Sequence, residues 1–333
     1  MNVAIVRRAL LTPLALVVEC ASIPLVGVLL IVATPLAVLT TRRLSVPRAM
    51  VVTIAYLALD VWAFVLCAVA AAVCLLRGQG RDVLAERAYG IGTRILHRLF
   101  FVARRVLDLH VSVEDSDDAL AAVTGQSTPL IVLSRHAGPG DTFLVVHELV
   151  MRGRRTRVLL RAALRLDPAI DVLGSLLSFA FVRRGAGKSA PTLQRITRLA
   201  AAMLGNGAFV LFPEGGNVSR ERVQRRLQRL REQGSAWQAE SAARLRHLGP
   251  PFPGGVLAAL RGAPHADVLF VAHSGLAGME GPVWRWIPVH RTLRMRWFLV
   301  PCSEVPRDEE GQNRWLFEWW QRLDDTVEDS FGN

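Results

Sequence analysis

Lysine is almost missing from this sequence, since Lys188 is the only one and nearly all positive charge is carried by arginine. Acidic residues are also few, 28 against 40 basic residues, which leaves a formal net charge of +12. Such a basic chain favours anionic partners: nucleic acid, phospholipid headgroups or phosphorylated substrates. The sequence has no nucleic-acid-binding motif and no internal repeat, and its long apolar segments favour the other two classes. We therefore expect no nucleic-acid partner.

Cysteine is scarce as well, and none of the four residues forms a C-x-x-C pair. Three of them, Cys20, Cys67 and Cys74, lie in apolar segments. This spacing gives no sign of a disulfide framework or a zinc site. We expect no metal, and free cysteines that act as small apolar side chains in a reducing, cytoplasmic setting.

A further missing feature is the Gly-x-Ser-x-Gly turn. A membrane-bound hydrolase of the α/β type would use this turn to present its nucleophilic serine. Its absence argues against that class of enzyme.

Two long apolar segments, 9–41 and 49–76, lie near the amino terminus, in a chain that is 51% hydrophobic. Each exceeds the roughly 20 residues that cross a bilayer, and the first is too long for the apolar part of a signal peptide. We expect residues 1–78 to form a two-helix hairpin that anchors the chain in the cell membrane, with the remainder on the cytoplasmic side. Three prolines and Glu19 in the first segment leave an alternative open, a hairpin that dips into one leaflet.

Two basic segments follow the hairpin. Residues 79–105 combine apolar and basic side chains at helical spacing, which predicts an amphipathic helix, either at the membrane face or packed on the surface of the domain. Residues 219–231 contain six arginines. That segment favours either a solvated basic helix or docking on anionic membrane lipid.

Residues 79–333 read as an α/β domain with a tryptophan-rich carboxy-terminal extension. Short apolar runs that alternate with helical patterns predict the strands 106–113, 130–133, 156–160, 179–182, 209–212 and 267–272. Such alternation indicates a mainly parallel sheet flanked by helices. Six of the eight tryptophans lie between Trp284 and Trp320, and we expect the helix around Trp315 to pack on the core.

The stretch from 129 to 152 is a strand, a Gly-Pro-Gly turn and a helix. His136 leaves the carboxyl end of the strand, and Asp141 opens the helix. The turn can bring the two side chains together, and a carboxylate on one imidazole nitrogen prepares the other nitrogen to take a proton. The plainer alternative is that Asp141 caps the helix and His136 is an ordinary loop histidine.

Two further blocks accompany this stretch. Residues 181–184 read Phe-Val-Arg-Arg, and residues 212–215 read Phe-Pro-Glu-Gly after an apolar strand. His-x4-Asp, Phe-Val-x-Arg and Phe-Pro-Glu-Gly in this order resemble the glycerolipid acyltransferase family, which includes 1-acylglycerol-3-phosphate acyltransferases. The resemblance covers residues 130 to 271, under half of the chain.

The resemblance implies a reaction and a role for each block. His136 would be the general base and Asp141 its orienting partner, so that the hydroxyl of a lysophospholipid attacks the thioester of acyl-CoA or acyl carrier protein. The family needs no metal, no further cofactor and no covalent intermediate. The residues implied in acceptor binding are Phe181, Arg184 with its neighbour Arg183, Phe212, Pro213, Glu214 and Gly215. Arg184 matches the arginine that holds the acceptor phosphate.

The chain departs from the family at three places. Arg135 stands where the family commonly has Asn. Gly216, Asn217 and Val218 replace the usual Thr-Arg-Ser, and the segment ending in His273 replaces a fourth block. Acyl transfer in phospholipid synthesis is the first expectation. Remodelling of another lysolipid and a non-catalytic lipid-binding protein of the same fold are the alternatives.

Overall fold

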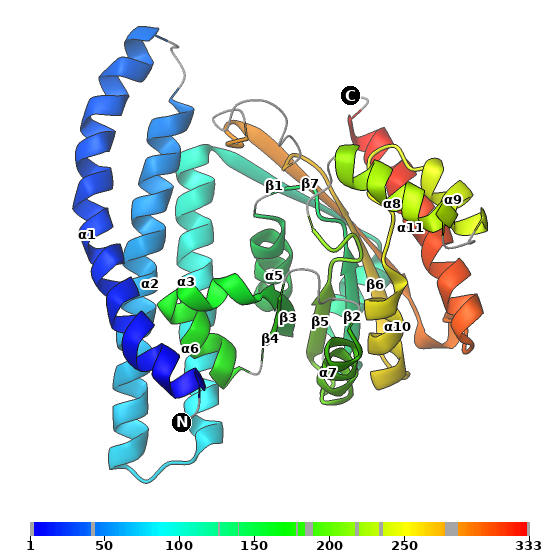
Figure 1. The fold of residues 1–333 in the computed structure, drawn as a ribbon, viewed down its shortest axis with the longest axis horizontal. Helices are drawn as coiled ribbons and strands as arrows, with labels where there is room; N and C mark the ends of the chain where they lie inside the picture. Colours follow the sequence, from blue (N-terminus) through cyan, green and yellow to red (C-terminus); the bar gives the residue numbers. More distant parts are fainter. Residues whose placement is uncertain are drawn as a thin grey trace. The chain divides into compact units, whose positions relative to one another are not determined.

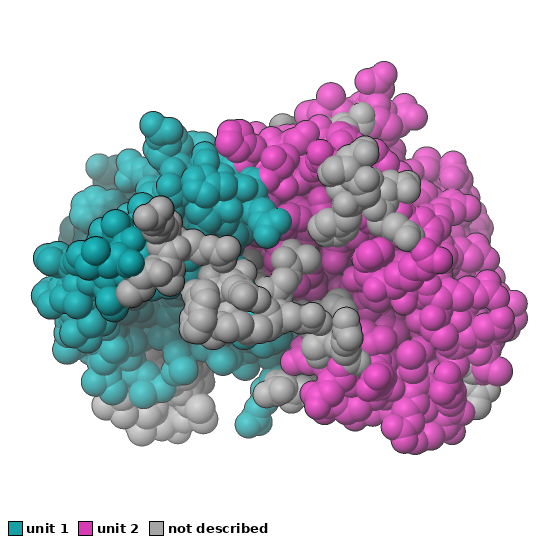
Figure 2. All heavy atoms as spheres, turned by 90° about the horizontal axis from the view of Figure 1, so that it is seen from above, with its two compact units in different colours: residues 1–109, 160–183, 282–291 teal, residues 110–159, 184–281, 292–333 magenta. Residues whose placement is uncertain are grey.

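The computed structural model describes residues 3–40, 44–125, 127–138, 140–177, 179–183, 189–216, 220–232, 236–276 and 286–331. It divides into two compact units, which Figure 2 colours separately. Unit 1 contains Met1–Leu109, Leu160–Arg183 and Pro282–Arg291. Unit 2 contains His110–Leu159, Arg184–Gly281 and Thr292–Asn333. The predicted fold class, a mainly parallel sheet flanked by helices and preceded by two long apolar helices, is confirmed.

The elements follow one another as Figure 1 labels them. Those of unit 1 are α1 (Val3–Thr40), α2 (Ser45–Leu76), α3 (Arg81–Leu107), the 3-10 helix η1 (Ala162–Leu166), α6 (Pro168–Leu176) and β4 (Ala180–Val182). Those wholly or mostly in unit 2 are β1 (Leu109–Asp115), α4 (Asp117–Thr124), β2 (Leu130–Ser134), α5 (Asp141–Met151), β3 (Arg155–Arg161), α7 (Ala190–Ala201), β5 (Gly207–Leu211), α8 (Arg220–Glu232), α9 (Ala236–Ala243), α10 (Pro253–Gly262), β6 (Asp267–His273), β7 (Arg291–Val300), η4 (Cys302–Glu304) and α11 (Glu309–Phe331).

Six of the seven described strands build the sheet of unit 2, in the order β1-β7-β6-β2-β5-β3. β2 pairs in parallel with β5 on one side and with β6 on the other. Every residue of β2 and β5 is buried, as expected for central parallel strands that are covered on both faces. β7 pairs antiparallel with β6, and its burial alternates along the strand. The carboxyl ends of β2, β5 and β6 therefore meet at one edge of the sheet.

The core of unit 2 forms where helices cover this sheet. Ile196 of α7 and Val256 of α10 belong to the same buried cluster as Phe209 and Phe270 of the central strands. Trp315 of α11 contacts the Phe270 ring edge-on, with ring centroids 5.3 Å apart. The expectation that the tryptophan-rich helix packs on the core is confirmed.

Unit 1 is built on the two apolar helices. α1 packs against α2, and α2 packs against α3 and α6. Ala63, Cys67 and Ala70 of α2 form a buried cluster with Ile91 of α3 and Ala169 of α6. All four cysteines are free, as predicted. The segments Leu11–Leu39 and Ser45–Leu76 are long and apolar enough to cross a membrane, which is weak evidence for membrane association.

Candidate active site

A tight turn joins β2 to α5 and brings His136 back towards the start of the helix. Gly140 has a φ of 100°, a left-handed conformation that glycine adopts without the steric cost of a side chain. Asp141 is the first residue of α5, and Gly140 precedes it as the capping residue. The Asp141 carboxylate accepts the backbone N–H of Gly138 at 2.7 Å, so it closes the turn instead of capping the helix. The capping alternative for Asp141 is therefore wrong.

His136 and Asp141 form a direct pair. Nδ1 of His136 lies 3.1 Å from Oδ2 of Asp141, with the Asp141 side chain 0% and the His136 side chain 19% exposed. A carboxylate at Nδ1 favours the histidine tautomer that carries its proton on that nitrogen. The described residues place no partner on Nε2 of His136. That nitrogen keeps a lone pair and can accept a proton from a bound hydroxyl group.

Glu214, from the turn after β5, binds the backbone of His136. One of its carboxylate oxygens accepts the backbone N–H of His136, and the other accepts that of Gly249 at 2.8 Å. Burial raises the pKa of Glu214 to about 7, against the opposing effects of the Arg135 charge and of these two N–H groups. The described contacts of Glu214 are thus internal, and its predicted role in acceptor binding stays a prediction.

Arg135 is buried beside the same carboxylates. Its guanidinium donates to the backbone oxygen of His273 at 2.9 Å and to that of His247 at 3.4 Å. Burial lowers the pKa of Arg135, while the charges of Glu214, Asp141 and Asp324 act in the opposite direction. The residue that departs from the family pattern therefore lies inside the protein, where it is the cation among buried acids.

His273 comes from the end of β6 and lies near Oδ1 of Asp141, whereas His136 contacts Oδ2. Its Nε2 lies 3.1 Å from the backbone oxygen of Arg135 and 4.0 Å from Oδ1 of Asp141. Burial lowers the pKa of His273, while the charge of Asp141 acts in the opposite direction. Ser134 and Val271 are register partners, and this pairing brings the residues after them to the same edge of the sheet.

Residues 246–249 form a loop that is held by hydrogen bonds with α11. Asp324 is buried and accepts the backbone N–H groups of Arg246, His247 and Leu248 at 2.6 to 2.8 Å. Trp320 donates its indole N–H to the backbone oxygen of Gly249 at 2.9 Å. The sequence analysis missed this role of Asp324, because no motif marks it. An acid on the apolar face of a predicted helix was the only available signal.

The turn after β5 contributes the other residues of the Phe-Pro-Glu-Gly block. The Phe212 ring lies against the imidazole of His136, with ring centroids 4.8 Å apart. The backbone oxygen of Pro213 accepts the N–H of Phe252 at 2.7 Å. Gly215 has a φ of 70°, and a Cβ there would lie 3.3 Å from the Phe252 ring. The structure thus brings Phe212 and Glu214 to His136, and the glycine allows the turn to pack closely.

The remaining predicted site residues are not part of this arrangement as described. Phe181 and Arg183 belong to unit 1, where the Arg165 guanidinium lies 4.5 Å from the centroid of the Phe181 ring. Arg183 is exposed. Arg184 lies outside the described residues, as do Asn217 and Val218. Their predicted roles stay predictions.

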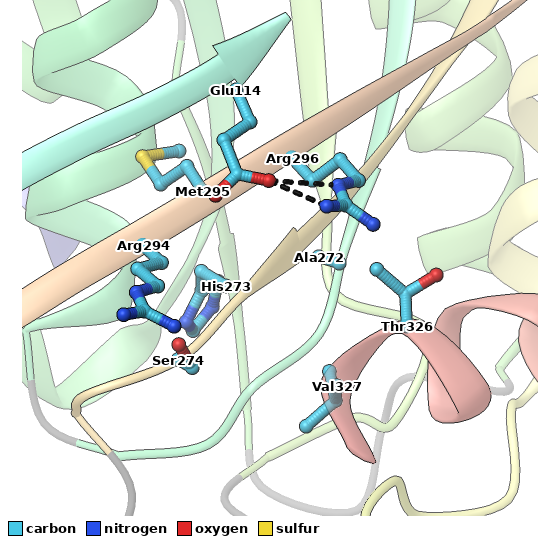
Figure 3. A pocket seen from close by; sticks show the side chains of 9 residues that line it. All are labelled: Glu114, Ala272, His273, Ser274, Arg294, Met295, Arg296, Thr326 and Val327. Atoms are coloured by element: carbon cyan, nitrogen blue, oxygen red, sulfur yellow. Dashed lines mark hydrogen bonds and ion pairs between the residues drawn. The ribbon is translucent and has the colours of Figure 1, made fainter. Parts of the chain in front are cut away.

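A small recess lies next to His273 on unit 2 (Figure 3). Arg296 closes one side of it through an ion pair with Glu114, at 2.5 Å. Its lining includes neither His136 nor Asp141, so we assign it no substrate. Within the described ranges, no group of three or more His, Cys, Asp or Glu side chains could hold a metal ion.

Comparison with known proteins gives one match. No curated protein and no solved structure matches the chain. Residues 110–249 match the family model described as Acyltransferase. This segment contains His136, Asp141 and Glu214, which the structure brings together. The match covers under half of the chain and supports acyl transfer in general.

Proposed function

We propose that the protein moves a fatty acyl group from a thioester donor, acyl-CoA or acyl carrier protein, to the free hydroxyl of a lysophospholipid. One observation carries the proposal. Within the segment that matches the family, a fully buried carboxylate holds Nδ1 of His136 at 3.1 Å and leaves Nε2 ready to accept a proton. A hydroxyl is a weak nucleophile until a base removes its proton, and this arrangement supplies such a base.

The reaction needs one base and no covalent intermediate. His136 Nε2 takes the proton of the acceptor hydroxyl, and the hydroxyl oxygen bonds to the carbonyl carbon of the thioester. The carbon–sulfur bond then breaks, and the electron pair leaves with the sulfur. The imidazolium returns the proton to the thiolate, so the products are an ester and a free thiol. Asp141 stabilises the imidazolium between the two proton transfers.

For the acceptor, we propose 1-acylglycerol-3-phosphate, in a reaction of phospholipid biosynthesis on the cytoplasmic face of the membrane. The arginine-rich composition, with a net charge of +12, suits an anionic substrate. A guanidinium binds phosphate through two parallel hydrogen bonds, which is the role proposed for Arg184 or its neighbour Arg183. Another lysolipid as acceptor and lipid binding without catalysis are the alternatives that the following experiment separates.

Transfer from a labelled acyl thioester to a panel of lysolipids tests the acceptor. We expect lysophosphatidic acid to be used best, and Arg184→Ala to lower kcat/KM for that acceptor about 10- to 100-fold, because one charge-assisted contact is lost. The KM for the acyl donor should stay unchanged. Arg261→Ala, which removes an exposed arginine of α10, is the matched control.

Three results would count against this choice of acceptor. Equal acceptor kinetics in wild type and Arg184→Ala would place the phosphate on another cation, with Arg183→Ala as the next variant. Preference for a lysolipid with a zwitterionic headgroup would favour remodelling. Binding of lysolipids without any transfer would leave only the non-catalytic alternative.

A further inference from the structure

The apolar helix α2 has two different faces. Its outer face exposes large side chains at helical spacing, Trp62, Val65, Val69 and Leu76. Its inner face is buried through Ala63, Cys67, Ala70 and Cys74. α1 beside it is apolar and has no buried residue in the segment Leu11–Leu39. A helix surrounded by lipid would be exposed on all sides, whereas α2 has one buried face. The elements that cover this face therefore decide whether α2 can cross a membrane or only lie on it.

The inner face of α2 is covered by α3 along much of its length, together with Ala169 of α6. Near the end of α2, Cys67 and Ala70 pack with Leu84 and Ile91 of α3. At the start of α2, Arg48 contacts Nε2 of His290 at 2.9 Å. The backbone N–H of His290 donates to Leu107, the last residue of α3, at 2.9 Å. The two helices thus run antiparallel over much of the length of α2, side by side as Figure 1 shows.

α3 exposes ionisable side chains in its first turns, at its middle and at its end, together with the apolar Val83 and Phe101. At 1.5 Å per residue its 27 residues extend for about 40 Å, which is more than the about 30 Å of a hydrocarbon core. The exposed ionisable residues are Arg81, Asp82, Glu86, Arg94, His97, Arg98, Arg104 and Arg105. If α2 crossed the bilayer, α3 would cross beside it, with Arg94 and Arg98 near the centre, where charged side chains are costly.

A second contact on α2 leads to the same conclusion. The start of α6 meets α2 near its midpoint, where the Tyr56 hydroxyl donates to Asp167 and the Asp60 carboxylate accepts the N–H of Ala169 at 3.4 Å. η1 precedes α6 and also contacts α1. Non-helical backbone does not occur in the lipid-exposed hydrocarbon region. The middle of α2 is therefore covered on one side by a segment whose non-helical backbone would have to be shielded from lipid if α2 crossed the bilayer.

We propose that α1 and α2 lie along one leaflet of a lipid bilayer and do not span it. The acyl chains of that leaflet contact the exposed apolar surface of α1 and the outer face of α2. α3, η1 and α6 then remain on the aqueous side, and the arginines of α3 stay hydrated. Of the two forms expected for the hairpin, the contacts of α2 support the one that dips into a single leaflet.

Depth along α1 tests this arrangement in the full-length protein. Leu11, Leu25 and Leu39 are exposed and equally spaced, so adjacent sites lie about 21 Å apart along a helix. Each is changed singly to cysteine in a Cys20→Ser, Cys302→Ser background, labelled with a fluorophore and reconstituted in phosphatidylglycerol–phosphatidylcholine vesicles. Quenching by lipids that carry nitroxides at two depths should give similar depths at all three sites. A label at Leu25 that lies about 10 Å or more deeper than the two ends would overturn the proposal.

Sidedness gives an independent measurement. Leu44→Cys lies between α1 and α2, Arg77→Cys lies after α2, and Gln228→Cys on α8 reports the side of unit 2; all three native residues are exposed. In cells and in inverted membrane vesicles, an impermeant maleimide should label all three from the same side. Labelling of Leu44→Cys only from the opposite side would show a spanning hairpin.

A different observation, at the candidate site, carries a second proposal, which rests on the proposed function. Arg135 and His273 hold each other through two contacts: the guanidinium donates to the His273 backbone oxygen, and the imidazole Nε2 bonds the Arg135 backbone oxygen. Oδ1 of the fully buried Asp141 has no hydrogen-bond partner among the described residues. His273 Nε2 lies 4.0 Å from it, beyond hydrogen-bond distance.

We infer that Arg135 and His273 act as one unit that positions Asp141. The His273 N–H holds the backbone of Arg135, the Arg135 charge stabilises the Asp141 carboxylate, and the carboxylate in turn orients the base. Both residues are positioning residues, since neither reaches the reacting atoms. This chain thus has a buried arginine and histidine where the family pattern has an asparagine and a different fourth block.

A double-mutant cycle tests whether Arg135 and His273 act together on the reaction or stabilise the protein independently. Arg135→Asn and His273→Leu should each lower kcat about 10- to 100-fold with little change in either KM. The double variant should be no slower than the slower single variant, to within about twofold. His273→Gln, which keeps an N–H donor near the same place, should recover most of the rate.

The controls distinguish failure of the positioning proposal from failure of the proposed function. Arg154→Asn removes another buried arginine, whose guanidinium donates to the backbone oxygens of Val123 and Thr128, so it should lower thermal stability without lowering kcat of the folded protein. Effects of Arg135→Asn and His273→Leu that multiply, or a wild-type rate in His273→Leu, would overturn the positioning unit alone. Absence of acyl transfer in the wild type would instead refute the proposed function.

Discussion

His136→Ala is expected to lower the rate of acyl transfer by about 100- to 10,000-fold, the usual contribution of a positioned general base. Without the imidazole, no described side chain is placed to take the proton of the acceptor hydroxyl. The fold should be retained, because the backbone N–H of His136 that binds Glu214 is still present and the side chain lies in a turn. The measurement is kcat with a labelled acyl thioester and saturating lysophospholipid.

Two comparisons secure the interpretation of that result. His265→Ala removes an exposed histidine of unit 2 and should leave the rate unchanged. Thermal unfolding should show that His136→Ala remains folded. A folded His136→Ala protein that keeps more than about a tenth of the wild-type rate would show that His136 is not the base.

Asp141→Asn should be equally severe, although it changes the size of the side chain very little. The asparagine oxygen can still accept the Gly138 N–H and close the turn. The same oxygen position, Oδ2, also faces Nδ1 of His136, so the asparagine keeps both contacts but loses the charge that stabilises the imidazolium. We expect a loss on the order of 10,000-fold in kcat, by analogy with the corresponding substitution in a serine protease triad.

The outcome separates two roles of the carboxylate. A severe loss with unchanged thermal stability assigns Asp141 to the proton transfer. Full activity in Asp141→Asn would reduce it to a residue that closes the turn. The structure favours the first outcome, because Asp141 contacts both the turn and the imidazole.

The central strands were predictable because burial on both faces leaves a plain apolar run. The expected strand 130–133 appears as β2 (Leu130–Ser134), and 267–272 appears as β6 (Asp267–His273). The expected strand 106–113 begins three residues later, at Leu109, because α3 continues to Leu107. Apolar residues at a helix end and at a strand start look alike in sequence, so tertiary packing sets this boundary.

β7 was not predicted, although it is the longest described strand. Its buried residues Leu293, Met295 and Trp297 alternate with arginines, a pattern of period two that is typical of a half-covered antiparallel strand. In an arginine-rich chain, such alternation is hard to tell from a basic surface segment. Only the pairing with β6 distinguishes a strand from a basic surface segment. This pairing runs from Val268 with Val300 to His273 with Met295.

The candidate site was predictable only where residues are close in sequence. His136 and Asp141 are five residues apart, and the turn between them is visible in the sequence. The supports of the pair come from distant segments: Glu214 reaches His136, and Asp324 holds the backbone N–H groups of residues 246–248. The order of the parallel strands brings these segments together, and one sequence without the sheet order does not specify it.

The fate of the acyl group in the wild-type protein tests the central claim most directly. Purified protein in vesicles is mixed with an acyl thioester labelled in its acyl chain and with 1-acylglycerol-3-phosphate, and the label is followed in lipid, water-soluble and protein fractions. The account predicts that the label moves into the diacyl lipid as one free thiol appears per ester formed, with none bound to protein. Label released as free fatty acid, or held on the protein as a stable acyl-enzyme, would contradict direct transfer by the His136–Asp141 pair.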